Sequence, residues 1–435
     1  MKQSKKIEYY IQKKAFWFLF LFIVLISPTI SQTFYVCATA SGSDDGSSWL
    51  NAYKQLPENL ERGATYYIGG GNYPSYIFDD PEIGSTYIII RKATISDHSS
   101  SIGWDDKYGS DIAVFGRLSF TKGYYKFDGV TGGGPSAWTS DHGFEVVENW
   151  SSSETNGRLI SFSQYITNIT IRHVNIHPAV THQGRGHAFY GLDVSNITVQ
   201  NCYAHDNFGV FFFVRRSGYF LVEHNYFYNN LSTAAWHTEF ISDVGSDNFV
   251  FRYNKFKDIQ GTAVFAGVNG DEGNPHENWD IYGNIFLDCC PIIHFYYSGP
   301  NLNEAINWSF YNNTVIGNNS RSSNISFEKA TDVRLYNNIF WKFLEPGYLA
   351  LSTNIDYKNN TFYDVNTRGA TPSENNKNSF YYGNEPFVVN PESNNYALEK
   401  GSNSTGVILG RSYDVDMYGV ERGTDGIWDR GAIEF

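Results

Sequence analysis

One asparagine recurs at the same place in a series of short β-prone runs, and this repeat constrains the fold more than any other feature of the chain. The pattern apolar-x-x-Asn-x-apolar occurs in VEHNYF, FRYNKF, IYGNIF, FYNNTV, LYNNIF and YKNNTF. Successive copies are 29, 30, 29, 25 and 22 residues apart, at Asn225, Asn254, Asn284, Asn313, Asn338 and Asn360. Repeats of this length, without helix-length apolar patterns, are typical of a solenoid.

The asparagine also indicates which solenoid the chain forms. Its short amide tolerates bends and can bond to nearby backbone, and identical amides on successive turns can form a ladder. We therefore predict an all-β chain, a single-stranded parallel β-helix with one asparagine at the same corner of every coil. In an earlier coil Cys202 holds this position, so we expect a buried small hydrophobe there. Apolar residues two positions further on should form an inward stack: Ile176, Ala204, Phe227, Phe256, Phe286, Val315, Phe340 and Phe362.

Residues 1–32 have the composition of a secretory signal peptide. Five lysines precede the twelve apolar residues Ala15–Ile26, which are too few to span a bilayer, and a small polar stretch follows. We predict cleavage after Ser31 or Gln32 and a secreted protein, whether extracellular, periplasmic or on the cell surface. The alternative is an uncleaved N-terminal anchor.

The rest of the chain, residues 33–435, is expected to be one domain, because solenoids grow by adding coils. A short amphipathic helix from about Trp49 to Leu60 should lie across the first coil and hide its unpaired strand edge. The predicted parts are an N-terminal cap at 33–85, coils at 86–365 that become regular from Ile169, and an irregular C-terminal loop and cap at 366–435.

The charge balance bears on possible partners. The chain has 32 basic and 45 acidic residues. Removing residues 1–32 takes away five lysines and one glutamate, which leaves 27 basic against 44 acidic side chains and a net charge of −17. This argues against nucleic acid and, after signal cleavage, against anionic membranes as partners. It is compatible with binding of calcium or sugars.

We expect a monomer. The four cysteines do not have the spacing of a disulfide framework.

The two ends and the repeats together resemble a known group. The opening YVCATASGSDDGSSW, the later GGGNY, the asparagine coils and the closing WDRGAIEF are similar to secreted right-handed parallel β-helix proteins of the pectate-lyase-like superfamily. The resemblance covers nearly all of residues 33–435 and implies a right-handed coil. That superfamily includes polysaccharide lyases, glycoside hydrolases, epimerases and non-catalytic adhesins, so the fold does not choose an activity.

Residues 238–265, TEFISDVGSDNFVFRYNKFKDIQGTAVF, resemble the central coil of alginate- and chondroitin-type polysaccharide lyases. The resemblance places Glu239 at a calcium-binding glutamate and His237 at a second acidic ligand. It places Val244 at the catalytic lysine and Ala266 at the catalytic arginine, so both basic positions are apolar in this chain.

Two groups of residues could carry chemistry on a polysaccharide. The first is a column three positions after the asparagine slot: His177, His205, Tyr228 and Lys257. The neighbouring Asp206, Asn229, Asp258 and Asp288 could instead be turn residues. The second group lies on or beside the next strand of neighbouring coils: Arg185, His187, Arg215, Arg216, His237, Glu239, Asp243 and His294. Trp236, Phe211 and Phe213 could add a flat surface for sugar stacking. The alternative for this group is solvated strand residues, some of them turned inward.

Elimination at a uronate needs a cation or cationic group on the carboxylate, a base and an acid. We expect the base to be His205 or His237, and Arg215 or Arg216 to hold a substrate carboxylate. Substrate contacts are expected from Arg185, His187, Trp236, His294 and Lys257, and ligands for a calcium cofactor from Asn207, Glu239 and Asp243. The leading hypothesis is a carbohydrate-active protein that cleaves a polysaccharide by β-elimination or hydrolysis. The alternative is a non-catalytic glycan-binding or adhesive surface protein.

Overall fold

The computed structural model describes residues 32–148, 157–179, 186–207, 209–230, 238–267, 275–289, 291–295, 304–317, 324–342, 345–348, 352–363, 380–382, 388–390, 395–398 and 405–434. The predicted signal peptide lies outside these residues, apart from Gln32. No helix in the described part of the chain has both the length and the apolar run needed to cross a membrane.

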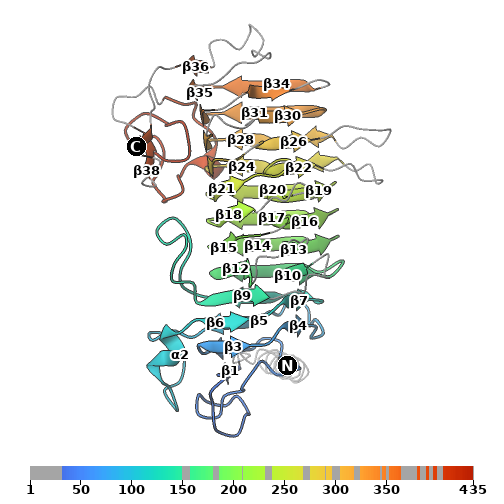
Figure 1. Ribbon diagram of the computed structural model, residues 1–435, viewed down its shortest axis with the longest axis vertical. Coiled ribbons are helices and arrows are strands. Elements are labelled where there is room, and N and C mark those ends of the chain that lie inside the picture. The colour runs from blue at the N-terminus through green and yellow to red at the C-terminus, as the bar shows by residue number, and fades with distance from the viewer. Residues whose placement is uncertain are drawn as a thin grey trace, which may run out of the picture.

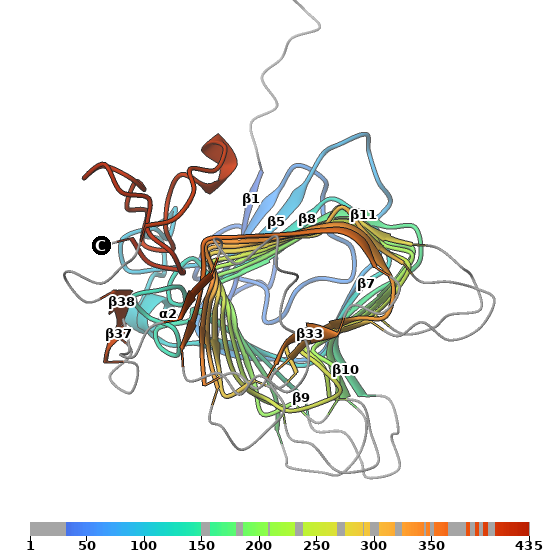
Figure 2. The same cartoon turned by 90° about the horizontal axis from the view of Figure 1, so that it is seen from above.

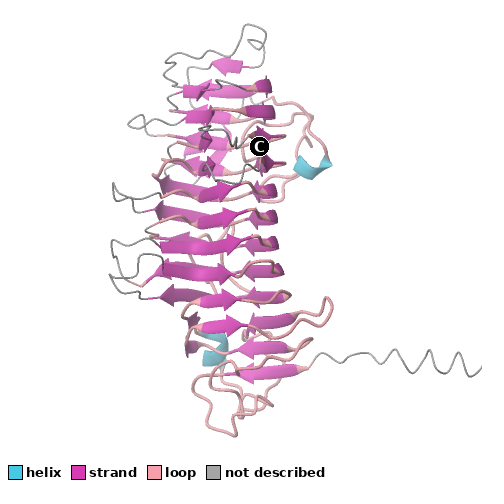
Figure 3. Ribbon diagram, turned by 90° about the vertical axis from the view of Figure 1, so that its right-hand side faces the viewer, coloured by secondary structure: helices cyan, strands magenta, loops and turns pink. Residues whose placement is uncertain are grey.

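Three long parallel sheets run along the molecule, and the chain visits them in turn (Figure 1, Figure 3). Through most of the coils, consecutive strands lie in different sheets, and hydrogen-bonded neighbours within one sheet are a full coil apart in sequence. Seen along the axis, the coils superimpose as a three-sided tube (Figure 2). The structure is therefore a parallel β-helix, as the asparagine repeat predicts, and parallel crossovers of this kind are almost always right-handed.

The first sheet, sheet A, contains β1 (Thr33–Val36), β2 (Thr65–Ile68), β5 (Ile88–Lys92), β8 (Tyr125–Asp128), β11 (Thr167–Arg172), β14 (Ser195–Gln200), β17 (Gly218–Glu223), β20 (Asp247–Arg252), β23 (His276–Glu277), β24 (Asp280–Tyr282), β27 (Ala305–Ile306), β28 (Ser309–Tyr311), β31 (Ala330–Tyr336) and β34 (Thr353–Lys358). Sheet B contains β3 (Gly71–Tyr73), β6 (Ala113–Phe115), β9 (Phe144–Glu148), β12 (Val174–Pro178), β15 (Tyr203–His205), β18 (Tyr226–Asn230), β21 (Lys255–Ile259), β25 (Ile285–Leu287), β29 (Thr314–Ile316), β32 (Ile339–Trp341), β35 (Asn360–Tyr363) and β36 (Phe380–Tyr382). Sheet C contains β4 (Tyr76–Phe78), β7 (Leu118–Phe120), β10 (Gly157–Phe162), β13 (Gly186–Leu192), β16 (Phe212–Arg215), β19 (Ile241–Val244), β22 (Phe265–Gly267), β26 (Ile293–Phe295), β30 (Asn324–Phe327) and β33 (Glu345–Tyr348). A separate antiparallel pair joins β37 (Val388–Asn390) to β38 (Asn395–Leu398).

The six asparagines form one continuous ladder at the corner between sheets A and B. Each side-chain amide donates to the side-chain oxygen of the next, over 3.0, 3.1, 3.0, 3.1 and 2.9 Å from Asn225 to Asn360. All six are fully buried. Cys202 continues the column, as predicted, and its backbone N–H donates to Asn225 Oδ1 over 2.8 Å. The residue before each asparagine has a positive φ, so a left-handed residue makes the bend and the asparagine secures it.

The predicted inward stack is also confirmed. Its eight members pair in register along sheet B, and all are buried. Neighbouring rings lie close enough to stack, with centroids 5.4 Å apart for Phe227 and Phe256 and 4.8 Å apart for Phe256 and Phe286. Such pairs stabilise a core beyond the area that they bury.

The predicted capping helix from Trp49 to Leu60 is wrong. The segment is irregular, and Tyr53 pairs with the first strand: its N–H donates to Tyr35 O over 2.9 Å, and Cys37 N donates to Tyr53 O over 2.7 Å. The apolar spacing suggested one helical face, but Trp49 and Leu60 pack into two different clusters. The open edge is thus covered by backbone pairing.

The α-helix of the described chain is α2 (Asp106–Ser110), and a single 3-10 turn, η3, follows at Arg411–Tyr413.

The C-terminal segment, residues 405–434, folds back along the side of the later coils rather than over their end (Figure 1, Figure 2). It docks at the corner between sheets A and B. Tyr253 Oη donates to Val415 O over 3.2 Å, and Ala432 N donates to Thr314 Oγ1 over 2.9 Å. Its irregular backbone agrees with the sequence, but its place on the flank was not predicted.

Candidate functional site

The predicted site residues fall on two different faces of the coil. His205 and Lys257 belong to β15 and β21 of sheet B. His187, Arg215 and His294 belong to sheet C. His205 and Arg215 are therefore separated by the corner between these sheets, so they do not form the predicted pair of base and carboxylate-binding residue on one surface. Arg185, Trp236 and His237 lie outside the described residues.

The outer face of sheet C carries a row of rings and cations, here called the arginine–aromatic strip: Arg158, His187, Tyr190, Phe213 and Arg215. Tyr190 and Phe213 are register partners, and their rings stack 5.5 Å apart at 4°. The Arg158 guanidinium lies 3.4 Å from the centre of the Tyr190 ring, and that of Arg215 lies 5.1 Å from the Phe213 ring. His187 packs 5.1 Å from the same Phe213 ring. The two rings thus stack face to face, with Arg158 against Tyr190 and Arg215 beside Phe213.

The strip is positively charged although the chain carries a net charge of −13. The four strands β10, β13, β16 and β19 contain one carboxylate, Asp243. That carboxylate points into the core, so it does not neutralise the arginines from the outer face. A face of this kind attracts anions, and guanidinium groups match the geometry of a carboxylate.

Asp243 is not placed to bind a metal on this face, in contrast to our prediction. Its Oδ2 lies 2.6 Å from His276 Nδ1 and accepts from Ser246 N over 3.0 Å, and its Oδ1 accepts from the Ser246 hydroxyl. Asp243 and His276 are both fully buried. The pair is part of the interior, because β19 turns this side chain inward.

We predict that Asp243→Ala lowers the free energy of unfolding by about 2–3 kcal/mol, because His276 and Ser246 lose a buried partner. Glycan binding by the variant that remains folded should be unchanged. Chemical unfolding and a binding assay on the same sample measure both. Loss of binding without loss of stability would restore Asp243 to the site.

Arg216 also has a different role from the one predicted. It occupies the corner between sheets C and A with a φ of 47°. Its Nε and Nη2 donate to the two carboxylate oxygens of Asp193 over 2.6 and 2.7 Å. This fork holds the pKa of Asp193 below its usual value. Arg216 therefore joins two coils, and Arg215 is the arginine that faces outward.

The remaining predicted metal ligands are Asn207 and Glu239. Both are buried, and neither amide atom of Asn207 has a hydrogen-bond partner among the described residues. On the next coil, Asn230 donates from Nδ2 to Glu239 O over 3.1 Å, which places the glutamate near the same corner. Calcium takes six to eight oxygen ligands, and without Asp243 these residues supply only part of such a shell. Within the described ranges, no group of three or more His, Cys, Asp or Glu side chains could hold a metal ion.

His294 lies further along sheet C, in register with Ala266 on one side and Ser326 on the other. It is half-buried, and burial lowers its pKa although the Glu328 charge opposes the shift. The imidazole is therefore neutral near pH 7, the state in which histidine accepts a proton.

On sheet B, the predicted column stacks as expected. His205 lies 4.6 Å from the His177 ring and 4.2 Å from the Tyr203 ring. Its Nδ1 lies 2.7 Å from Asp206 Oδ2 and its Nε2 3.1 Å from Asn175 Oδ1. Burial lowers the pKa of His205. Both ring nitrogens are engaged, which favours a structural role. The residues one position after this column have positive φ, as turn residues do: Asp206, Asn229, Asp258 and Asp288.

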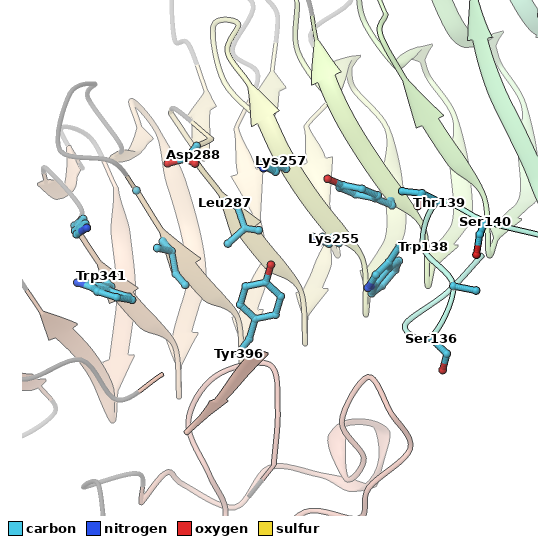
Figure 4. A pocket seen from close by; sticks show the side chains of 15 residues that line it. Ser136, Trp138, Thr139, Ser140, Lys255, Lys257, Leu287, Asp288, Trp341 and Tyr396 are labelled. Atoms are coloured by element: carbon cyan, nitrogen blue, oxygen red, sulfur yellow. The ribbon is translucent and has the colours of Figure 1, made fainter. Parts of the chain in front are cut away.

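The same outer face continues into a feature that the sequence did not reveal, here called the lateral groove (Figure 4). Its volume is about 790 Å³, and outward side chains of sheet B form its floor. One wall is the loop at 136–140 with Trp138, and the other includes Tyr396 of β38. Lys257 lines it, together with Lys255, a residue that the predictions passed over. Lysine at two successive outward positions of one strand was the signal.

These features define a right-handed parallel β-helix protein with two distinctive outer faces. A family model described as a right-handed beta helix region matches residues 147–303. No curated protein matches the chain. Similar solved structures include the pectate lyase Pel9A, at 13% identity and a TM-score of 0.43, with 93% of this chain and 96% of that chain covered. A rhamnogalacturonan lyase is 13% identical with a TM-score of 0.41, and the match covers 93% of this chain and 96% of that chain. The PL6 family alginate lyase AlyGC is 12% identical with a TM-score of 0.36, and the match covers 86% of this chain and 57% of that chain. The three parallel sheets and the family match confirm the predicted β-helix, apart from its capping helix.

Proposed function

We propose that the protein is carbohydrate-active and that sheet C binds an acidic polysaccharide along the arginine–aromatic strip. The observation that carries the proposal is the Tyr190–Phe213 stack with an arginine beside each ring, on strands whose one carboxylate is buried. Uronate carboxylates pair with guanidinium groups, and the outward edges of the stacked rings offer apolar contact to a sugar. A neutral glycan would use only half of this surface.

The reaction that suits this face is β-elimination at a uronate. Arg215 would hold the substrate carboxylate and make the adjacent C–H more acidic. A neutral histidine would take that proton as the bond to the leaving sugar oxygen breaks, and a proton from water or from an acid on the face would complete the leaving group. On sheet C the pKa of His294 is lowered, but three strand spacings, about 14 Å, separate its strand from that of Arg215. His294 therefore does not reach the carbon next to a carboxylate that Arg215 holds. His237, outside the described residues, remains the other predicted base.

A non-catalytic glycan-binding protein is the second candidate, and one observation favours it. Val244, one coil beyond Arg215, and Ala266 occupy the positions of the two basic catalytic residues in the lyases that the chain resembles. Both side chains are buried. An adhesive β-helix would need the strip but no base.

The test is a panel of polysaccharides, with polygalacturonate and alginate as acidic probes and dextran as the neutral one. We expect binding of an acidic probe, weakened about tenfold or more by Arg215→Ala or Tyr190→Ala. Arg334→Ala is the matched control, because Arg334 is an outer-face arginine of sheet A bonded to Asn307. Equal affinity of the two site variants and the wild type would contradict the proposal.

The same panel separates a lyase from a binding protein. Elimination creates a conjugated unsaturated uronate that absorbs in the ultraviolet, whereas hydrolysis creates reducing ends without that absorbance. Binding with neither product supports the adhesive alternative. The same assays with EDTA test whether binding or cleavage depends on the predicted calcium ion. The described residues alone do not complete a calcium shell.

Secretion and a monomeric state also stay proposals. Expression of the full chain should yield a medium or periplasmic protein that begins at residue 32 or 33, and light scattering should give the mass of one chain. An intact N-terminus in the membrane fraction would favour the uncleaved anchor.

A further inference from the structure

The lateral groove lies on a different face from the arginine–aromatic strip, and its floor extends over several coils. Outward side chains from β18, β21, β25, β29 and β32 line it, from Tyr226 to Trp341. Four strand spacings separate the first of these strands from the last, or about 19 Å. The groove is therefore long enough for several linked sugar units rather than for one small molecule.

Aromatic rings surround the cation at the centre of the groove. Lys255 Nζ lies 4.7 Å from the centre of the Tyr226 ring and 5.6 Å from that of Tyr396. Figure 4 shows Trp138 and Tyr396 on either side of Lys255. The rings come from three separate parts of the chain, namely a loop, a strand of sheet B and β38. These rings line the groove beside the lysine and offer apolar contact to a sugar ring that lies in it.

Two lysines project from one strand into the groove. Lys257 follows Lys255 at the next outward position, and its Nζ lies 5.9 Å from the Tyr228 ring. The carboxylate among the lining residues is Asp288. Burial, and then the charge of Lys257, lowers the pKa of Lys255 to about 8. A buried cation beside a second cation gains more from an incoming anion than an exposed one does.

We propose that the lateral groove is a second glycan-binding site, which takes a segment of an acidic polysaccharide and holds a uronate carboxylate with Lys255 and Lys257. The aromatic walls would pack against sugar rings on either side of that carboxylate. This site extends the proposed function of sheet C but does not depend on it. One protein would then hold two stretches of polymer on different faces.

The test measures binding of oligogalacturonate by calorimetry, with oligomers of dextran as the neutral comparison. Wild type should bind two acidic oligomers. Lys255→Met and Lys257→Met should each weaken one site about tenfold or more, and the double variant should bind one oligomer. Lys126→Met is the matched control, because Lys126 lies over a tyrosine ring in the same way, 4.9 Å from Tyr87, on sheet A. Its binding should equal that of the wild type.

A second readout is the pH dependence of binding. Affinity at the groove should fall as the pH rises through about 8, where Lys255 loses its charge. Tyr226 of β18 and Tyr396 of β38 also face Lys255, but burial raises the pKa of both phenols, so they stay neutral. The other charged residues that line the groove are Lys257, Asp288 and Lys342. The fall should be absent in Lys255→Met.

The outcomes keep the two proposals apart. An Arg215→Ala, Tyr190→Ala protein that still binds one acidic oligomer, in a lysine-dependent way, supports the groove even if sheet C proves inactive. Unchanged affinity and stoichiometry in both lysine variants would overturn the groove proposal and leave the strip untouched. Equal binding of dextran would overturn recognition of the carboxylate.

Discussion

Replacing Asn284 by leucine should lower the free energy of unfolding by about 3–5 kcal/mol, because one buried side chain makes four hydrogen bonds. Its Oδ1 accepts from Asn254 N and Nδ2 over 2.9 and 3.1 Å. Its Nδ2 donates to Phe251 O over 2.8 Å and to Asn313 Oδ1 over 3.0 Å. Leucine leaves a buried N–H and a buried carbonyl without partners at a bend that cannot take up water. Calorimetry or chemical unfolding measures the loss.

The chain supplies its own control for this experiment. Cys202 holds the same position in an earlier coil, and its thiol lies 3.3 Å from Gln200 O. Asn284→Cys should therefore destabilise less than Asn284→Leu, since a small side chain with a weak donor is already accepted at this corner. A melting midpoint that is the same for leucine and wild type would mean that the ladder does not hold the coils together.

Arg422→Met should lower the free energy of unfolding of the C-terminal segment by about 3–5 kcal/mol, because it leaves a buried carboxylate without its cation. Arg422 Nη1 lies 3.2 Å from Glu434 Oε2. Its Nη2 donates to Gly431 O and Ala432 O over 3.1 Å each. Burial lowers the pKa of Arg422 and raises that of Glu434, so burial disfavours both charged forms. The attraction between the two charges offsets part of this cost.

Limited proteolysis is the direct measurement, with cleavage expected within residues 405–434 of Arg422→Met. The double variant Arg422→Met, Glu434→Met should recover part of the lost stability, because no unpaired charge remains. Glu421→Gln, at the adjacent exposed position, is the control and should resist protease as wild type does. Equal resistance of Arg422→Met and wild type would show that the pair is dispensable.

The sequence was sufficient for the features that repeat. The asparagine column and the inward stack follow from identical spacing, because residues one coil apart must lie side by side in a solenoid. Cys202 could be placed for the same reason. No repeat marks the first coil. There the apolar spacing between Trp49 and Leu60 resembles that of a helix, but in the structure Tyr53 pairs with β1.

Site residues were harder to place because the corner between sheets B and C varies in length from coil to coil. His205 and Arg215 are close in sequence, but one precedes this corner and the other follows it. Around Glu239 the simple alternation of faces also fails, because Phe240 and Ile241 both enter the core. Asp243 therefore points inward although it lies an even number of residues from Glu239.

The lateral groove could not be found from local sequence. Its walls come from residues near 138 and 396, and its floor comes from the coils between them. Only the folded-back C-terminal region brings these parts together. Two lysines in one strand were visible, but nothing in the sequence indicated that Tyr396 would cover one of them.

The docking of the C-terminal segment on the flank has a consequence for how the chain reaches its final state. A solenoid can build coil by coil from its N-terminus, since each coil needs only its neighbour. The bonds of this segment instead join residues 162, 118 and 69 positions apart, as in Tyr253 with Val415, Thr314 with Ala432 and Thr361 with Arg430. Contacts of such long range form late. The later coils should therefore be only partly stabilised during synthesis. Their backbone amides should become protected from hydrogen exchange only after the last residues have left the ribosome.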